Sequence, residues 1–204
     1  MQYISLGCDC SVTYQLRKYG LQTMGTMPFD WMKLDKLQDL IAILDNNFTG
    51  FEKFDNYTVK SQSDNFVNMD LVNMGSEKVL SRRKLIHNKY KFILPHEYMN
   101  DSLDIEQFEA KYVRRIIRFR TLLTDSSIKK IFVRLCGDKE TREKSNYVKN
   151  KIYLEECLAR YGCVNFKVIV INYNDYDSLI PDKYTWSRDY IPWSEVLELE
   201  LDLK

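Results

Sequence analysis

The chain has 204 residues, of which 45% are hydrophobic and 29% charged, a composition that suits one globular domain and excludes a disordered chain. Its 30 Lys and Arg residues nearly balance its 29 Asp and Glu residues. Net charge therefore does not favour a nucleic acid or a membrane surface as partner. We predict one domain over residues 1–204 that binds neither.

The N-terminal sequence, MQYISLGCDC, lacks the basic opening and the apolar stretch of a secretory signal. No run approaches the roughly 20 apolar residues that span a bilayer. These features predict a cytoplasmic protein, in which most of the five cysteines are reduced thiols.

The first expected elements are a strand and a helix joined by a tight turn. Residues 3–6 form a short apolar run that ends at Gly7. Apolar residues at helical spacing over residues 11–19 then predict a helix. A second helix follows, with Asp35 and Gln38 as a capping pair, and ends near Asn46. 

The segment over residues 48–101 has no clean hydrophobic period. Its aromatic residues are scattered among Asn, Asp and Ser. We predict irregular structure here, with one strand at residues 90–94.

The second half of the chain alternates helices and strands. Residues 105–123 predict a long helix, residues 131–135 and 166–171 predict strands, and residues 148–161 predict a helix between the two strands. This order favours an α/β fold with a mostly parallel central sheet flanked by helices. The aromatic residues of 174–204 predict an ordered segment packed over the core.

Cys10 is the candidate nucleophile. It follows the expected turn at Gly7 and lies nearer to the start of the predicted helix than Cys8 does. Unpaired N–H groups and the positive end of a helix dipole lower the pKa of a thiol, and they can also hold an oxyanion. Its position fits a small buried apolar residue as well, because free cysteines are commonly buried.

A catalytic thiolate needs a base, and the chain has two histidines, His87 and His96. His96 follows the strand-like residues 91–95, so its side chain could be aimed into a cleft; a hydrogen-bonded structural role fits it equally well. His87 lies in a polar stretch and is predicted to be a surface histidine. His96 is therefore the candidate base.

Asp30 lies in the sequence PFDW at residues 28–31, between two large rings. A carboxylate in this setting could orient His96 or contact substrate, and it could equally cap a helix or pair with a buried arginine. Asn172, at the end of a predicted strand, is the second candidate for orienting the imidazole. We rank Asp30 above it.

These residues make the chain similar to the DUF1796 family, described as papain-like cysteine peptidases. The resemblance runs from about residue 3 to residue 172, and its most specific parts are the spaced SLGxxC and PFDW sequences. The segments that carry it are SLGCDC at 5–10, PFDW at 28–31, PHEY at 95–98, the Arg-rich helix at 112–123 and IFVR at 131–134.

The resemblance implies a cysteine hydrolase, peptidase or acyltransferase in which Cys10 takes the thiol position, His96 the histidine position and Asp30 the acidic position. Glu97 stands where the family usually has Asp. A papain-like fold would be α+β, with the helix of the nucleophile against a largely antiparallel sheet, and this is the alternative to a parallel sheet.

A site that contains Cys10 is expected in either architecture. In a parallel sheet, residues 7–10, residues 136–138 and Asn172 would all follow strand ends, where ligands bind in open α/β sheets. The substrate is expected to be a peptide, an ester or another small molecule. The predicted substrate-binding residues are Gly7, Asp9, Trp31, Arg115 and Arg118.

The alternative function is a non-catalytic module, or one that handles a glycan or nucleotide and holds an anion on an Arg-rich helix. Arg114, Arg115, Arg118 and Arg120 cluster on that helix, although such a cluster is usually a solvated face. No GxGxxG, P-loop or GxSxG motif is present. The cysteine spacing does not suit a zinc site, so we expect no metal and no cofactor.

Overall fold

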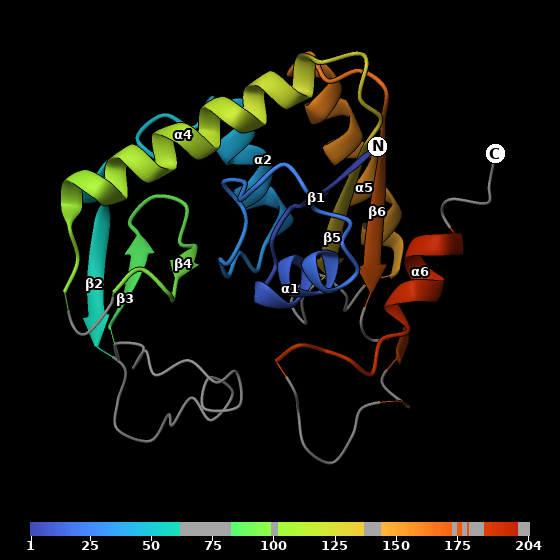
Figure 1. The fold of residues 1–204 in the computed structure, drawn as a ribbon, viewed down its shortest axis with the longest axis horizontal. Helices are drawn as coiled ribbons and strands as arrows, with labels where there is room; N and C mark the ends of the chain where they lie inside the picture. Colours follow the sequence, from blue (N-terminus) through green and yellow to red (C-terminus); the bar gives the residue numbers. More distant parts are fainter. Residues whose placement is uncertain are drawn as a thin grey trace.

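A computed structural model shows two sheets, one parallel and one antiparallel, in the part of the chain that it describes (Figure 1). The described residues are 1–61, 83–98, 102–136, 144–172, 175–176, 179 and 186–199.

The parallel sheet has the order β1 (Gln2–Ser5), β5 (Lys130–Cys136), β6 (Phe166–Asn172). All residues of the central strand, β5, are buried, as expected for the middle strand of a parallel sheet that is covered on both faces. The prediction of a parallel sheet in an α/β fold is confirmed. Each of these strands ends within one residue of its predicted end.

Alternating side chains of the parallel sheet pack into two hydrophobic clusters. Phe132 points into the larger cluster, which it shares with α2 (Leu37–Asp45), α4 (Ile105–Thr124) and α5 (Lys144–Arg160). Val133, the next residue, points into the second cluster. That cluster holds residues of α1 (Cys10–Lys18) and α6 (Trp193–Leu199), among them Val12, Leu16, Trp193 and Leu197.

The predicted helices are present, although one predicted cap is wrong. Lys36, not Asp35, is the N-cap of α2, and its side chain makes no capping hydrogen bond. Asp104 does cap α4, because its carboxylate accepts a hydrogen bond from the N–H of Gln107 at 2.9 Å. Figure 1 shows α4 running along one side of the molecule, from β2 to the neighbourhood of α5.

The antiparallel sheet corrects the prediction of irregular structure over residues 48–101. It has the order β2 (Tyr57–Ser61), β3 (Arg83–His87), β4 (Ile93–Leu94), and only β4 lies in the strand predicted from the sequence. In β2 only Tyr57 is buried, so the strand lacks the alternation by which a half-buried strand is recognised.

His87 is also corrected, because it is a core residue with 2% exposure and not a surface histidine. Its Nδ1 accepts hydrogen bonds from the N–H groups of Lys89 and Tyr90 at 3.2 and 3.3 Å. The rings of Tyr57 and Phe92 lie 4.9 Å from its imidazole. Burial lowers the pKa of His87 to about 4.

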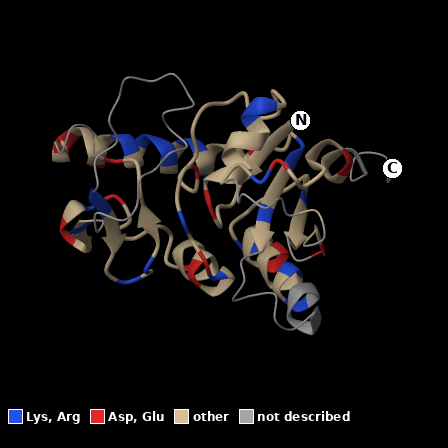
Figure 2. Ribbon diagram, turned by 90° about the horizontal axis from the view of Figure 1, so that it is seen from below, with Lys and Arg blue, Asp and Glu red and all other residues tan. Residues whose placement is uncertain are grey.

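The C-terminal residues 186–199 pack against α1 and the parallel sheet. Ile191, Trp193 and Leu197 are buried in the second hydrophobic cluster. Acidic and basic residues are interspersed over the described ribbon (Figure 2). Among the described helices, none combines the length and the apolar character that crossing a membrane requires.

The buried His87 predicts an acid-sensitive free energy of unfolding. The pKa of His87 is about 4 in the folded protein, compared with 6.5 for an unperturbed histidine, which represents the unfolded chain. Between pH 4 and pH 6.5 the unfolded chain therefore binds more protons than the folded protein. Stability therefore falls as the pH drops through this window, by about 2 kcal/mol between pH 7 and pH 5. Urea unfolding at both pH values measures the loss.

The His87→Leu variant is the control for this prediction. It should show a smaller stability difference between the two pH values than the wild type, even if it is less stable at both. An equal pH dependence in the variant would mean that His87 is not the responsible group.

Candidate active site

The start of α1 and the antiparallel sheet are joined through the backbone of residues 33 and 34. The N–H of Leu34 donates to the carbonyl of Cys8 at 2.9 Å. Lys33 exchanges two hydrogen bonds with Ile93, of 2.9 and 2.8 Å, and thereby forms an isolated antiparallel bridge. The loop before α1 and the strand before His96 are thus held at a fixed separation by main-chain bonds.

The turn from β1 to α1 uses an unusual backbone conformation. Gly7 and Cys8 have φ angles of 79° and 87°, and Cys8 is therefore strained. The guanidinium of the buried Arg134 donates to the carbonyls of Leu6 and Leu34 at 3.0 and 2.7 Å. These two bonds hold the turn against the segment at Leu34. Gly7, a predicted substrate-binding residue, therefore lies within the turn between β1 and α1.

Cys10 and His96 meet across the junction between the two sheets. The Sγ atom of Cys10 lies 3.3 Å from Nε2 of His96, although the residues are 86 positions apart. Cys10 is the first residue of α1, and His96 follows β4. Both are half-buried, whereas Cys8, Cys136, Cys157 and Cys163 are buried. The structure therefore brings together the two residues that the sequence singles out as nucleophile and base.

The thiol of Cys10 is not activated by a lowered pKa, contrary to the expectation from its place at a helix start. Burial, and secondly the carboxylate of Asp9, raise its pKa to about 12. Burial also lowers the pKa of His96, against the opposing effect of Glu97. Burial therefore favours the neutral form of both groups, and in a neutral pair the S–H group donates to Nε2 while the imidazole carries its proton on Nδ1.

Trp31 and Asp9 lie beside this pair. The ring of Trp31 meets the His96 imidazole edge-on, with centroids 6.3 Å apart. Asp9 is the N-cap of α1, and its Oδ1 accepts hydrogen bonds from the N–H of Ser11 at 2.9 Å and from the Ser11 hydroxyl. Its Oδ2 accepts from Nε of Arg188 at 2.9 Å.

Asp30 is buried, but its described hydrogen bonds do not include one to His96. Its Oδ1 accepts from the hydroxyl of Thr13 at 3.2 Å. Its Oδ2 accepts from the amide of Gln22 at 2.6 Å and from the N–H of Met27 at 2.8 Å. Burial raises the pKa of Asp30, and these donors oppose the rise. The carboxylate thus ties α1 to the turn that carries Trp31.

The second orienting candidate, Asn172, has a different partner. Its amide donates to the carboxylate of Asp175 at 3.3 Å. Of residues 136–138, which were expected near it, Gly137 and Asp138 lie outside the described residues.

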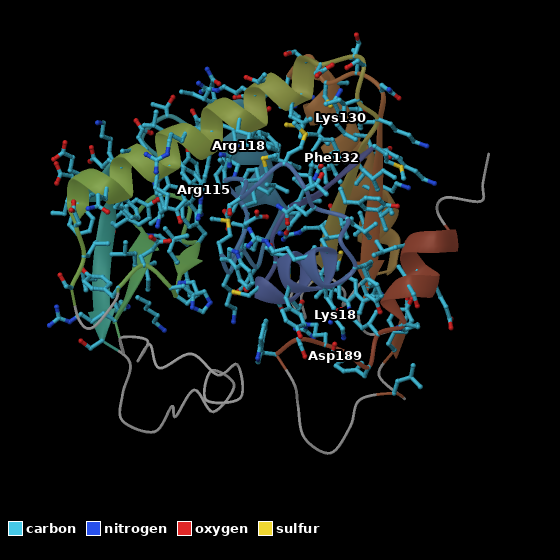
Figure 3. The ribbon with its side chains drawn as sticks, viewed as in Figure 1. Lys18, Arg115, Arg118, Lys130, Phe132 and Asp189 are labelled. Atoms are coloured by element: carbon cyan, nitrogen blue, oxygen red, sulfur yellow. The ribbon has the colours of Figure 1, made fainter. Side chains whose placement is uncertain are left out.

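The predicted anion-binding arginines lie on α4, where several have partners within the protein (Figure 3). The Arg118 guanidinium donates to the carbonyl of Thr26. Arg115 stacks over the ring of Tyr112, with its Cζ 5.0 Å from the centroid. Arg120 donates to the backbone carbonyl of Asn47 at 2.7 Å. The contacts of Arg118 and Arg120 connect α4 to the segments at Thr26 and Asn47, whereas Arg115 and Tyr112 both belong to α4.

Sequence reasoning assigned no role in the site to two residues, Glu97 and Arg188. Glu97, beside His96, accepts hydrogen bonds from the hydroxyl of Tyr112 at 2.8 Å and from the ammonium of Lys111, which anchors the His96 segment to α4. The acidic residue that the family usually has at position 97 could have indicated this role of Glu97. Arg188, 179 positions from Asp9, has no local sequence signal.

A hollow of about 540 Å³ lies along α4 and is lined by Glu97, Phe108, Lys111 and Arg114 among others, and neither Cys10 nor His96 is among its lining residues. Among the described residues, no cluster of three or more His, Cys, Asp or Glu side chains could hold a metal ion.

Comparisons with known proteins support the resemblance. A family model described as "Putative papain-like cysteine peptidase (DUF1796)" matches residues 1–175. The chain is 28% identical over 218 residues to "Uncharacterized protein R408" of Acanthamoeba polyphaga mimivirus, and the alignment covers 96% of each chain. No solved structure matches the chain.

The main-chain bridge at Lys33 predicts different effects for two substitutions of its exposed side chain. Lys33→Pro removes the N–H that donates to Ile93, and it should lower the free energy of unfolding by about 1–3 kcal/mol. Lys33→Ala keeps that bond and should cost less than about 0.5 kcal/mol. Urea unfolding compares the two variants, and equal losses would contradict the structural role of the bridge.

Proposed function

The chain belongs to the DUF1796 family, and from this premise we propose that it is a cysteine hydrolase, of the peptidase or acyltransferase type. Cys10 is the nucleophile and His96 the general base. The substrate class is an amide or ester, in a peptide or in a smaller molecule.

The observation that carries this proposal is the 3.3 Å separation between Sγ of Cys10 and Nε2 of His96. A nucleophile and its base must lie within such reach for proton transfer. Cys10 begins the helix that follows β1 of the parallel sheet, and His96 follows β4 of the antiparallel sheet. The strained turn at Cys8 and the bridge at Lys33 support this arrangement. Strained backbone of this kind clusters at functional sites.

The neutral state of the pair defines the chemical step. As the thiol sulfur attacks the carbonyl carbon, its proton passes to Nε2 of His96, so that a buried thiolate need not form first. The imidazolium then donates this proton to the leaving amine or alcohol, and a thioester remains on Cys10. Water or another acyl acceptor then attacks the thioester while His96 takes its proton. The C–S bond breaks, the proton passes from His96 to the sulfur of Cys10, and the acid or the acylated acceptor is released.

The N-terminus of α1 stabilises the oxyanion of the tetrahedral intermediate. The partial positive charge of the first helical turn lies beside Cys10, where the developing negative charge of the carbonyl oxygen would stand. In this proposal Asp30 acts as a positioning residue, which holds Trp31 against the ring of His96 through the turn at Met27.

Hydrolysis of a panel of activated esters and peptide amides tests the proposal. Cys10→Ser should lower kcat/KM by at least about 1000-fold, and His96→Gln by about 100-fold or more, because the thiol then lacks its base. Cys163→Ser, which changes a buried cysteine of the core, is the matched control and should retain activity.

An acyl adduct on the peptide that contains Cys10, detected by mass spectrometry, should accompany turnover in the wild type. If Cys10→Ser turned over a substrate as fast as the wild type, nucleophilic catalysis by Cys10 would be excluded.

A further inference from the structure

The C-terminal segment 186–193 lies along α1, from the cap residue Asp9 to Lys18 at the end of the helix. The amide of Gln15 donates to the carbonyl of Ser187 and to the carboxylate of Asp189, both at 2.8 Å. Lys18 forms an ion pair with Asp189 at 2.9 Å, and both are labelled in Figure 3. Because the family model ends at residue 175, these contacts come from a part of the chain outside the matched region.

Arg188 is the residue of this segment that reaches the site. Its Nε donates to Oδ2 of Asp9 at 2.9 Å, and its side chain is only 10% exposed. Its Nη1 donates to the hydroxyl of Tyr190 at 3.0 Å. Its carbonyl accepts hydrogen bonds from the indole of Trp193 at 2.9 Å and from the N–H of Ile191 at 3.0 Å. The guanidinium is therefore held in one direction, toward Asp9.

Asp9 transmits this contact to Cys10. One of its carboxylate oxygens caps α1 at Ser11, and the other binds Arg188, so the cap cannot turn away from the helix start. Cys10 is the next residue and the first of the helix. A carboxylate without a counter-charge at this place would oppose the developing charge on the oxyanion and on the sulfur.

We propose that Arg188 is a positioning residue for Cys10: it fixes the Asp9 cap at the start of α1 and offsets the negative charge of that cap beside the thiol. Its importance for turnover rests on the proposed function. The other charged groups near the pair of Cys10 and His96 include Glu97, which follows His96 in the chain, and Arg17, whose guanidinium lies over Trp31.

The rate of Cys10 alkylation by iodoacetamide, followed from pH 6 to pH 10 by peptide mass spectrometry, tests this proposal without a substrate. Asp9 contributes to raising the pKa of Cys10, so removing its counter-charge should raise it further. Arg188→Gln should therefore react about 3- to 10-fold more slowly at each pH. Arg188→Lys, which keeps the charge, should recover most of the rate.

Asp9→Asn should react faster than the wild type, and in that background Arg188→Gln should have little further effect. This coupling separates a charge effect from a general loss of packing. Lys18→Gln is the matched control, because it removes another contact of the same segment at a distance from Asp9, and its alkylation rate should equal that of the wild type.

The proposal is overturned if Arg188→Gln alkylates as fast as the wild type, or if it is slowed equally with and without Asp9. An equal slowing in Lys18→Gln would also overturn it. If Arg188→Gln does not fold, the alkylation rate of Asp9→Asn is the deciding measurement. A rate equal to that of the wild type contradicts the proposal. Retained turnover in Cys10→Ser would refute the proposed function, whereas the alkylation rates would still measure the effect of Arg188 on the thiol.

Discussion

The candidate site depends on the backbone of residues 33 and 34, which holds the parallel and antiparallel sheets together at one point. Leu34 binds the carbonyl of Cys8 on one side, and Lys33 pairs with Ile93 on the other. These bonds fix the loop before Cys10 relative to the strand before His96, together with the hydrophobic core that both sheets share and the bond of Glu97 to Tyr112 on α4. Main-chain hydrogen bonds suit this structural role, because they depend little on side-chain identity. The neighbouring side chains, such as those of Cys10 and His96, are then not needed to hold the segments together.

The electrostatics of the pair follow from burial. Desolvation raises the pKa of Cys10 and lowers that of His96, so each group is driven toward its neutral form. In our proposal the base accepts the proton during attack, and the surrounding charges matter most when the oxyanion and imidazolium develop. Asp9 is the charge nearest to Cys10 in the chain, and Arg188 is its partner.

Local signals in the sequence predicted the parallel strands and the helices α1, α2, α4 and α5, whereas α6 was expected only as part of an ordered segment over 174–204. The pairing of Cys10 with His96 was predicted from the two available histidines and from the family resemblance. Branched runs mark β5 and β6, and the helical period marks α4. The antiparallel sheet was missed, since β2 exposes all residues except Tyr57. The partners of Asp30 and Asp9 could not be predicted, because Thr13 and Arg188 reach them only through tertiary packing. His87 was misjudged because the aromatic residues that enclose it are distributed over separate elements.

The measurement that tests this account most directly is the ¹⁵N NMR signal of the His96 imidazole in the wild type and in Cys10→Ala near pH 7. A neutral pair predicts a proton on Nδ1 and none on Nε2, with the Nε2 shift changing when the thiol is removed. Protons on both ring nitrogens in the wild type would instead mean a thiolate–imidazolium pair. An Nε2 signal that is the same in both proteins would mean that the two residues do not interact.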